Sequence, residues 1–188
     1  MKLSEHKELK IEILALPPKE KDKLLLRLVA KDKVLTEHLH FLLLEDESNL
    51  RDRVAAIKEH IVETMRTLNS AKNNNSKDVL ASLRKLAKAV NHNFRVTKAA
   101  FEDVELRIFL YNNTITKFKS GIFSSYKNYD DMFATYFVKS TLVTLRKFYK
   151  LHEDLQYDLK EEMNKLLNKI YNENMAEIAN SLDLPEQI

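Results

Sequence analysis

A single glycine, Gly121, in 188 residues is the feature that most limits what this chain can fold into. Ordinary soluble proteins contain about 7% glycine, which corresponds to roughly thirteen residues at this length. Tight β-hairpins, dinucleotide-binding loops and phosphate-binding loops need glycine where the backbone takes a positive φ. The sequence therefore predicts an all-α protein, with helices joined by short polar connections and without the glycine-based catalytic motifs.

The charge of the chain is distributed unevenly. Lys and Arg minus Asp and Glu gives 0 over residues 1–70, +9 over 71–150 and −6 over 151–188. A basic middle and an acidic end either neutralise each other within the fold or leave a surface for an acidic partner. The internal match is the simpler interpretation, and both remain open at this level.

The composition also indicates a cellular compartment. The chain has no cysteine, which excludes disulfide bonds and thiolate zinc sites and suits a reducing environment. It shows no signal-peptide pattern at the N-terminus, and no apolar stretch is long enough to span a membrane. We therefore expect a cytoplasmic location.

Apolar residues recur at helical spacing along most of the chain and predict about eight helices. These cover approximately residues 4–15, 18–30, 34–43, 48–69, 76–94, 97–118, 130–145 and 153–181. Side chains that favour helix N-termini begin five of them: Ser4, Ser48, Ser76, Thr97 and Asp130. Gly121 is expected near the end of the sixth helix. Between 132 and 145 only Lys139 is charged, so this helix is expected to be the central one.

The connections predict the domain organisation. Pro17 and Pro18 separate the first two helices, and the lysine-rich turn at 31–33 joins two short helices into a small N-terminal hairpin. The polar run Asn73–Ser76 reads as a linker. We expect residues 1–70 to form the hairpin plus one long helix and residues 77–188 to form a helical bundle, within one continuous domain.

The N-terminal hairpin carries the one family resemblance. Residues 16–33 read LPPKEKDKLLLRLVAKDK, and residues 41–47 read FLLLEDE. This stretch resembles the opening helical hairpin of a bacterial all-helical family of unknown function, in its proline-led first helix and its lysine-rich turn. The resemblance covers residues 16–47 and implies a helical fold, with no activity and no site residues.

Metal and nucleophile chemistry find little support in the residue pattern. Glu37 and His40 have the Glu-x-x-His spacing of di-iron bundles, but that site needs a second such pair and two further glutamates. Glu59, His60 and Glu63 share one side of a helix, as an exposed polar face also does. We expect no metal site, no cofactor and no catalytic residues.

A line of positive charge is the most specific binding feature. Taken at 100° per residue, four basic side chains of the helix that begins at Ser76 fall within 20° of one line: Lys77, Arg84, Lys88 and Arg95. They lie opposite an apolar face made by Val79, Leu83, Leu86 and Val90. Such a line can follow a phosphate backbone, although a solvated helix face gives the same pattern.

Aromatic residues concentrate in the second half of the chain. Twelve of the sixteen lie between Phe101 and Tyr149. Their helical spacing favours core packing, with a small-molecule pocket as the alternative. Phe123, Tyr126 and Tyr129 fall in or beside a predicted loop and are candidates for contact with a partner.

The last helix has an apolar seam made by Leu155, Leu159, Met163, Leu166 and Ile170. It either folds back on the basic middle of the chain or packs against a second copy in a homodimer, which is the arrangement we favour. The predicted function is that of a non-catalytic cytoplasmic protein acting through protein–protein interaction or self-association. The alternative is a nucleic-acid-binding accessory protein that uses the basic helix face at 77–95.

Overall fold

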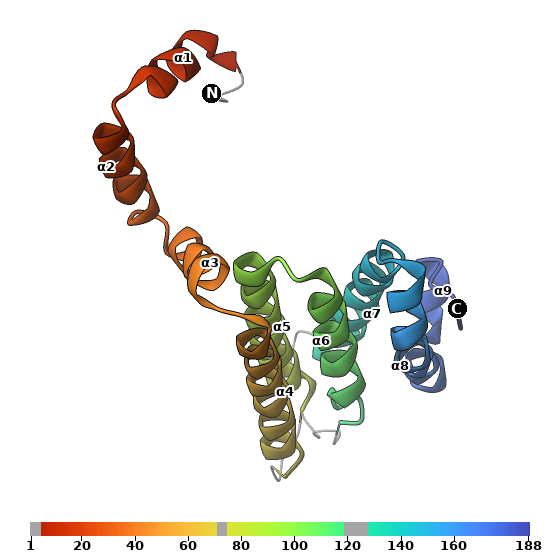
Figure 1. Cartoon of the computed structure of the whole chain (residues 1–188). Coiled ribbons are helices and arrows are strands. Elements are labelled where there is room, and N and C mark those ends of the chain that lie inside the picture. Colours follow the sequence, from red (N-terminus) through yellow and green to blue (C-terminus); the bar gives the residue numbers. More distant parts are fainter. Residues whose placement is uncertain (1–4, 71–74, 119–127) are drawn as a thin grey trace. The chain divides into compact units, whose positions relative to one another are not determined.

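The structure is a computed structural model, which describes residues 5–70, 75–118 and 128–188. Its regular elements in these ranges are helices. In these ranges 82% of the residues are helical and no strand is present (Figure 1). The helices are α1 (Lys7–Ala15), α2 (Pro18–Val29), α3 (Lys33–Leu44), α4 (Glu47–Ser70), α5 (Ser76–Thr97), α6 (Ala100–Asn113), α7 (Tyr129–Phe148), α8 (Glu153–Asn172) and α9 (Ala176–Ser181). The all-α prediction is confirmed. The expected last helix is two helices, because the chain leaves helical geometry after Asn172.

The chain divides into two compact units, residues 1–45 and 46–188. In the first unit, Pro18 occupies the first position of α2, where its missing N–H is not needed. The Asp32 carboxylate accepts the N–H groups of Val34 and Leu35, at 2.9 and 3.1 Å, and so begins α3. The turn between the two helices is as expected, yet none of the residues in α1, α2 or α3 is buried.

The second unit is the helical bundle, and it includes α4. The sequence grouped this helix with the N-terminal hairpin, with a boundary at 70–76. In the structure Val54, Ile61 and Met65 of α4 are buried, and the helix packs against α5 and α6. The seam of α4 therefore joins it to the bundle core, and the change of unit falls after Glu45.

The bundle helices begin at slightly different residues than predicted. Asp46 accepts N–H groups at the start of α4 in place of Ser48, Asn75 does so for α5 in place of Ser76, and Asn128 for α7 in place of Asp130. Each predicted residue has a polar neighbour one or two positions earlier, and Asp and Asn reach the free N–H groups well from there. Ser4 lies outside the described residues.

The predicted cap Thr97 is the last residue of α5 and does not begin α6. Its hydroxyl donates to the Asn93 carbonyl at 2.9 Å, as an in-helix threonine does, and accepts the Ala99 N–H at 3.3 Å. Lys98 takes the left-handed conformation, φ 58°, that reverses the chain. α5 and α6 are therefore joined without a glycine.

The most buried helix is α6 rather than α7. Half of the fourteen residues of α6 are buried, and it packs against α4, α5, α7 and α8. α7 also contacts four helices, but Met132 and Val143 on its outer face are 40% and 46% exposed. The scarcity of charge in α7 was misleading because two charged residues of α6, Asp103 and Arg107, are buried as a pair.

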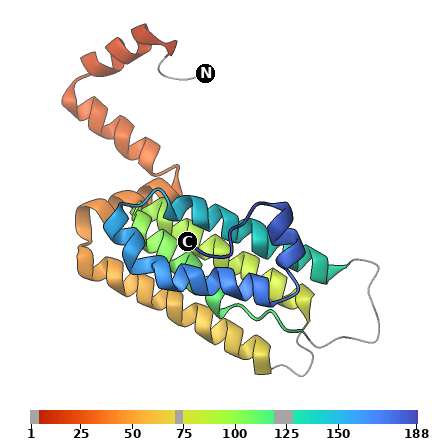
Figure 2. The same cartoon turned by 90° about the vertical axis from the view of Figure 1, so that its right-hand side faces the viewer.

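The apolar seam of α8 is filled by the chain's own bundle. Leu159 is 6% exposed, and Met163, Leu166 and Ile170 are fully buried. α8 packs along α6 and α7, and α9 lies against α7 and α8 (Figure 2). Of the two arrangements open at the sequence level, the fold-back is the one observed, so the seam gives no reason for a dimer.

Truncation of this seam should test the packing. We expect Leu166→Ala to lower the free energy of unfolding by about 3 kcal/mol, because it opens a cavity in a closed core. Leu155→Ala is the matched control, since Leu155 is 36% exposed at the end of the seam. Urea unfolding measures both, and similar losses for the two variants would contradict the observed burial.

Candidate functional site

The four residues of the predicted basic line are all exposed on α5. Lys77, Arg84, Lys88 and Arg95 lie on the side of α5 away from Val79, Leu83, Leu86 and Val90, which are buried in the bundle core. The apolar face holds α5 in place, so the cations project from a fixed helix.

Two of these cations lie over aromatic rings of α7. The Lys77 ammonium is 5.7 Å from the centre of the Tyr129 ring, and the Arg84 guanidinium is 5.2 Å from that of Tyr136. Tyr129 is therefore placed as the first residue of α7, beside the basic line and not in a free loop. The other two predicted contact residues, Phe123 and Tyr126, lie outside the described residues.

α7 and the turn after it add three exposed cations that the sequence analysis missed: Lys139 and Arg146 on the helix and Lys150 in the turn. Together with Lys77, Arg84, Lys88 and Arg95 they make up the surface we call the basic face. The signal for them was present, because no Asp or Glu occurs between residues 132 and 152. It was not used because only the tertiary contact between α5 and α7 puts the two segments side by side.

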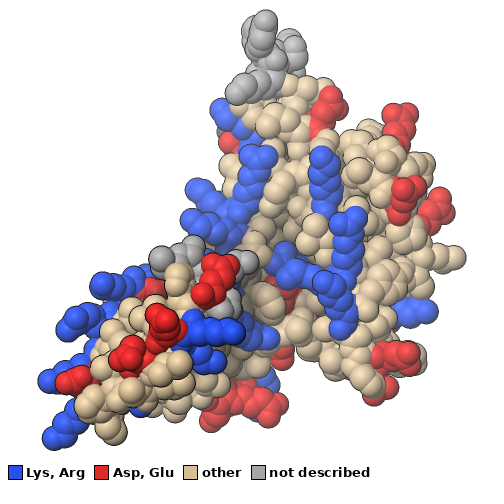
Figure 3. Space-filling model, turned by 90° about the horizontal axis from the view of Figure 1, so that it is seen from above, with Lys and Arg blue, Asp and Glu red and all other residues tan. Residues whose placement is uncertain are grey.

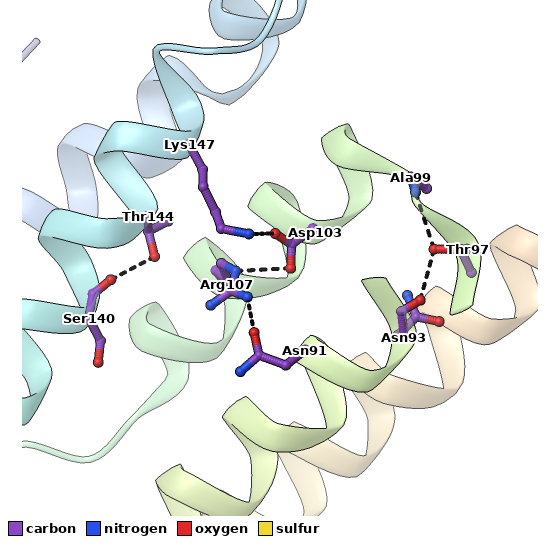
Figure 4. A network of polar contacts seen from close by, with 9 residues as sticks. All are labelled: Asn91, Asn93, Thr97, Ala99, Asp103, Arg107, Ser140, Thr144 and Lys147. Carbon is purple, nitrogen blue, oxygen red and sulfur yellow. Dashed lines mark hydrogen bonds and ion pairs between the residues drawn. The ribbon is translucent and has the colours of Figure 1, made fainter. Parts of the chain in front are cut away.

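A buried polar network holds α5, α6 and α7 together beneath this region (Figure 4). The Asp103 carboxylate, 2% exposed, accepts Arg107 Nε at 2.9 Å and Lys147 Nζ at 2.6 Å. Arg107 also donates to the Asn91 side chain on α5. The Lys147 ammonium lies 4.5 Å from the centre of the Phe94 ring. One carboxylate thus links three helices.

The network is suited to fixing helix positions. Charges taken out of water are tolerated only when they are paired and hydrogen-bonded, and here both oxygens of the carboxylate are used. Asp103 and Arg107 are almost fully enclosed, so neither presents a reactive group to solvent.

A half-buried cation closes the end of α6. Lys169 on α8 donates to the main-chain carbonyls of Tyr111, Asn112 and Thr114, at 3.1, 2.8 and 2.5 Å. These carbonyls lie at the negative end of the helix dipole, where a cation is stabilising. Burial lowers the pKa of Lys169 to about 8, against the opposing charge of Glu173.

The structure also bears on the metal site and the aromatic pocket considered for the sequence. Within the described ranges no group of three or more His, Asp and Glu side chains is close enough to hold a metal ion. The His40 ring pairs with Glu45, with 3.0 Å between Nδ1 and Oε1. In the aromatic segment Phe137 packs on Tyr111 and Phe133, with ring centres 5.5 and 5.6 Å apart. These rings belong to the bundle core.

The first unit presents a different kind of surface. Large apolar side chains are exposed along all three of its helices: Leu9, Ile11, Leu14, Leu25, Leu26, Leu28, Leu35, Leu42, Leu43 and Leu44. The exposed fractions reach 68% for Leu26 and 74% for Leu44. Single exposed leucines are common, but a run of this length without any buried residue is typical of an interaction surface.

No family model, curated protein or solved structure matches this chain. None of the helices in the described ranges is long and apolar enough to cross a membrane. Function therefore has to be inferred from two surfaces, the basic face of the bundle and the apolar helices of the first unit.

The buried network should be sensitive to loss of its carboxylate. We expect Asp103→Ala to cost about 3 kcal/mol or more in the free energy of unfolding, because Arg107 is left buried without a counter-charge. The double variant Asp103→Leu with Arg107→Met removes both charges and should recover part of that loss. Glu63→Ala, which breaks an exposed pair with Arg66, is the control and should change stability far less. Equal losses for Asp103→Ala and the double variant would contradict a buried, mutually dependent pair.

The lowered pKa of Lys169 predicts a pH dependence of stability. Between pH 8 and the ordinary pKa of 10.5, the unfolded chain holds one proton more than the folded chain. The free energy of unfolding of the wild-type chain should therefore rise over this range relative to that of Lys169→Met. Urea unfolding at pH 7.5, 9 and 10 measures the difference, with the exposed Lys160→Met as control. If the free energy of unfolding of the wild-type chain minus that of Lys169→Met stays constant or falls as the pH rises, the assignment is contradicted.

Proposed function

We propose that the chain is a non-catalytic cytoplasmic protein that self-associates through the helices of its first unit, α1–α3. The supporting observation is that ten large apolar side chains of these helices are exposed while none of their residues is buried. The cytoplasmic part of the proposal is supported by the absence of cysteine, which suits a reducing compartment.

The first unit is too small to supply its own core. It has 45 residues, and chains near this size usually need disulfides, metals or association to stay folded. Over residues 5–45, seventeen side chains are Leu, Ile, Val or Phe, which is ample apolar surface for an interface. Association therefore provides the burial that α1–α3 lack.

A second copy of the chain is the partner that the charges favour. Residues 5–45 contain eight Lys and Arg and eight Asp and Glu, so two copies do not repel each other and no oppositely charged partner is required. Symmetric pairing of identical surfaces is the commonest form of protein association. At about 100 Å² for each exposed apolar side chain, two copies would bury about 2,000 Å², as stable dimers do.

The two leucine runs are the best targets for a test. Each run places three consecutive leucines on a helix, at 24–26 in α2 and at 42–44 in α3. Leu26 and Leu43 are 68% and 72% exposed, so replacing them does not disturb a core within the chain.

Self-association should be visible as a mass of two chains in sedimentation equilibrium at 1–100 µM. We expect Leu26→Glu with Leu43→Glu to give the mass of one chain, because four carboxylates would then face each other in the dimer. The melting temperature of the bundle should be unchanged, since it has a core of its own.

The matched control is Val62→Glu, at a 46% exposed position of α4 in the second unit. This variant should keep the mass of two chains. A monomeric wild-type chain at 100 µM overturns the proposal, and so does a double variant that associates as tightly as the wild-type chain.

A further inference from the structure

We infer that the basic face of the bundle binds the phosphate backbone of a nucleic-acid duplex, without reading its sequence. The basic face consists of Lys77, Arg84, Lys88 and Arg95 on α5, Lys139 and Arg146 on α7, and Lys150 in the turn that follows α7. This site lies in the second unit and is independent of the association proposed for the first.

The contacts between α5 and α7 set the two rows of charge side by side. Lys77 lies over Tyr129, Arg84 lies over Tyr136, and Phe94 lies under Lys147. The pairs advance together along both helices, so α5 and α7 run parallel. This register brings Lys139 to within about one helical turn of the level of Lys88, and Arg146 to that of Arg95. The basic face is thus a double row.

The basic face is not neutralised by the acidic end of the chain. Among the described residues, only Lys117 and Glu173, 4.0 Å apart, form an ion pair between residues 71–150 and 151–188. None of the seven cations of the basic face pairs with a carboxylate in that part of the chain. Figure 3 shows Lys and Arg side chains in rows on the molecular surface. The acidic C-terminal segment therefore does not neutralise these cations within the described chain, and they are available to a partner.

Helix stability explains only some of these positions. Cations in the last turn stabilise a helix through its dipole, which accounts for Arg95 and Arg146. Lys77 stands in the first turn of α5, where the dipole is unfavourable to a cation. Arg84, Lys88 and Lys139 are in helix interiors. A ligand with regularly spaced negative charge accounts for the whole set.

The shape of the basic face favours a duplex over a single strand. From Lys77 to Arg95 the row extends about 27 Å, which corresponds to about eight base pairs of B-form DNA. Single-strand sites stack bases on free aromatic rings. Here Tyr129 and Tyr136 are covered by Lys77 and Arg84, so a regular backbone suits the site better than unstacked bases.

The experiment uses the full chain with a fluorescein-labelled 20-base-pair DNA duplex of arbitrary sequence, and follows fluorescence anisotropy from 50 to 200 mM KCl. Neutralising about six phosphates should weaken binding about 1,000-fold over this range. A second duplex of unrelated sequence should bind with the same affinity to within about threefold, because phosphate contacts carry no sequence information.

The test variant replaces Lys88, Arg95, Lys139 and Arg146 by Gln. None of these side chains makes a hydrogen bond or ion pair within the described chain, so folding should be unaffected, which a thermal melt checks. We expect at least a 100-fold loss of affinity at 50 mM KCl and a flatter salt dependence. The control replaces Arg51, Arg66, Lys160 and Lys165 by Gln, which removes the same charge from exposed positions on α4 and α8. It should bind within about threefold of the wild-type chain.

Three outcomes overturn the inference. The first is a wild-type chain without salt-dependent binding at 50 mM KCl, and the second is an equal loss of affinity in the test and control variants. The third is equal binding to the duplex, to its separated single strand and to vesicles with 30% phosphatidylserine, which indicates attraction to any negative surface. The Leu26→Glu, Leu43→Glu variant should still bind the duplex, so failure of self-association and failure of nucleic-acid binding are separable.

Discussion

The carboxylate of Asp103 is the group on which the arrangement of the bundle depends. It lies in the most buried helix, α6, and bonds to Arg107 on its own helix and to Lys147 on α7. Arg107 extends the network to Asn91 on α5. A buried charge is costly unless its partner is in place, so helix arrangements that separate these groups are disfavoured. The apolar core stabilises the bundle, and this network adds a cost to any arrangement in which α5, α6 and α7 are not neighbours.

The same contact determines how the surface is charged. The network connects α5 to α7 through α6, and the contact between α5 and α7 places two segments that are far apart in the sequence side by side. Lys147 forms an ion pair with Asp103, whereas the seven cations of the basic face have no carboxylate partner in the described chain. Two cations of α5 also contact aromatic rings of α7: Lys77 lies over Tyr129 and Arg84 lies over Tyr136. Packing and charge pattern therefore have a common origin.

The two units of the chain differ in whether their apolar side chains are buried. The bundle fills its own seams, including that of α8, and closes the end of α6 with the Lys169 cation. None of the residues in α1, α2 and α3 is buried, and each of these helices exposes leucines. One unit therefore has a complete core, and the helices of the other leave their apolar side chains exposed.

The sequence by itself determined the fold class and the position of most helices, because helical spacing and the near absence of glycine are local properties. It also showed the line from Lys77 to Arg95, which one helix creates alone. It could not show that Asp103 and Arg107 are buried, since charge normally predicts exposure and only a partner from α7 reverses that. For the same reason only the tertiary structure decided that α6 is the most buried helix, that α8 folds back and that the cations of α7 join those of α5. Each of these depends on contacts between residues far apart in the chain, which periodicity does not encode.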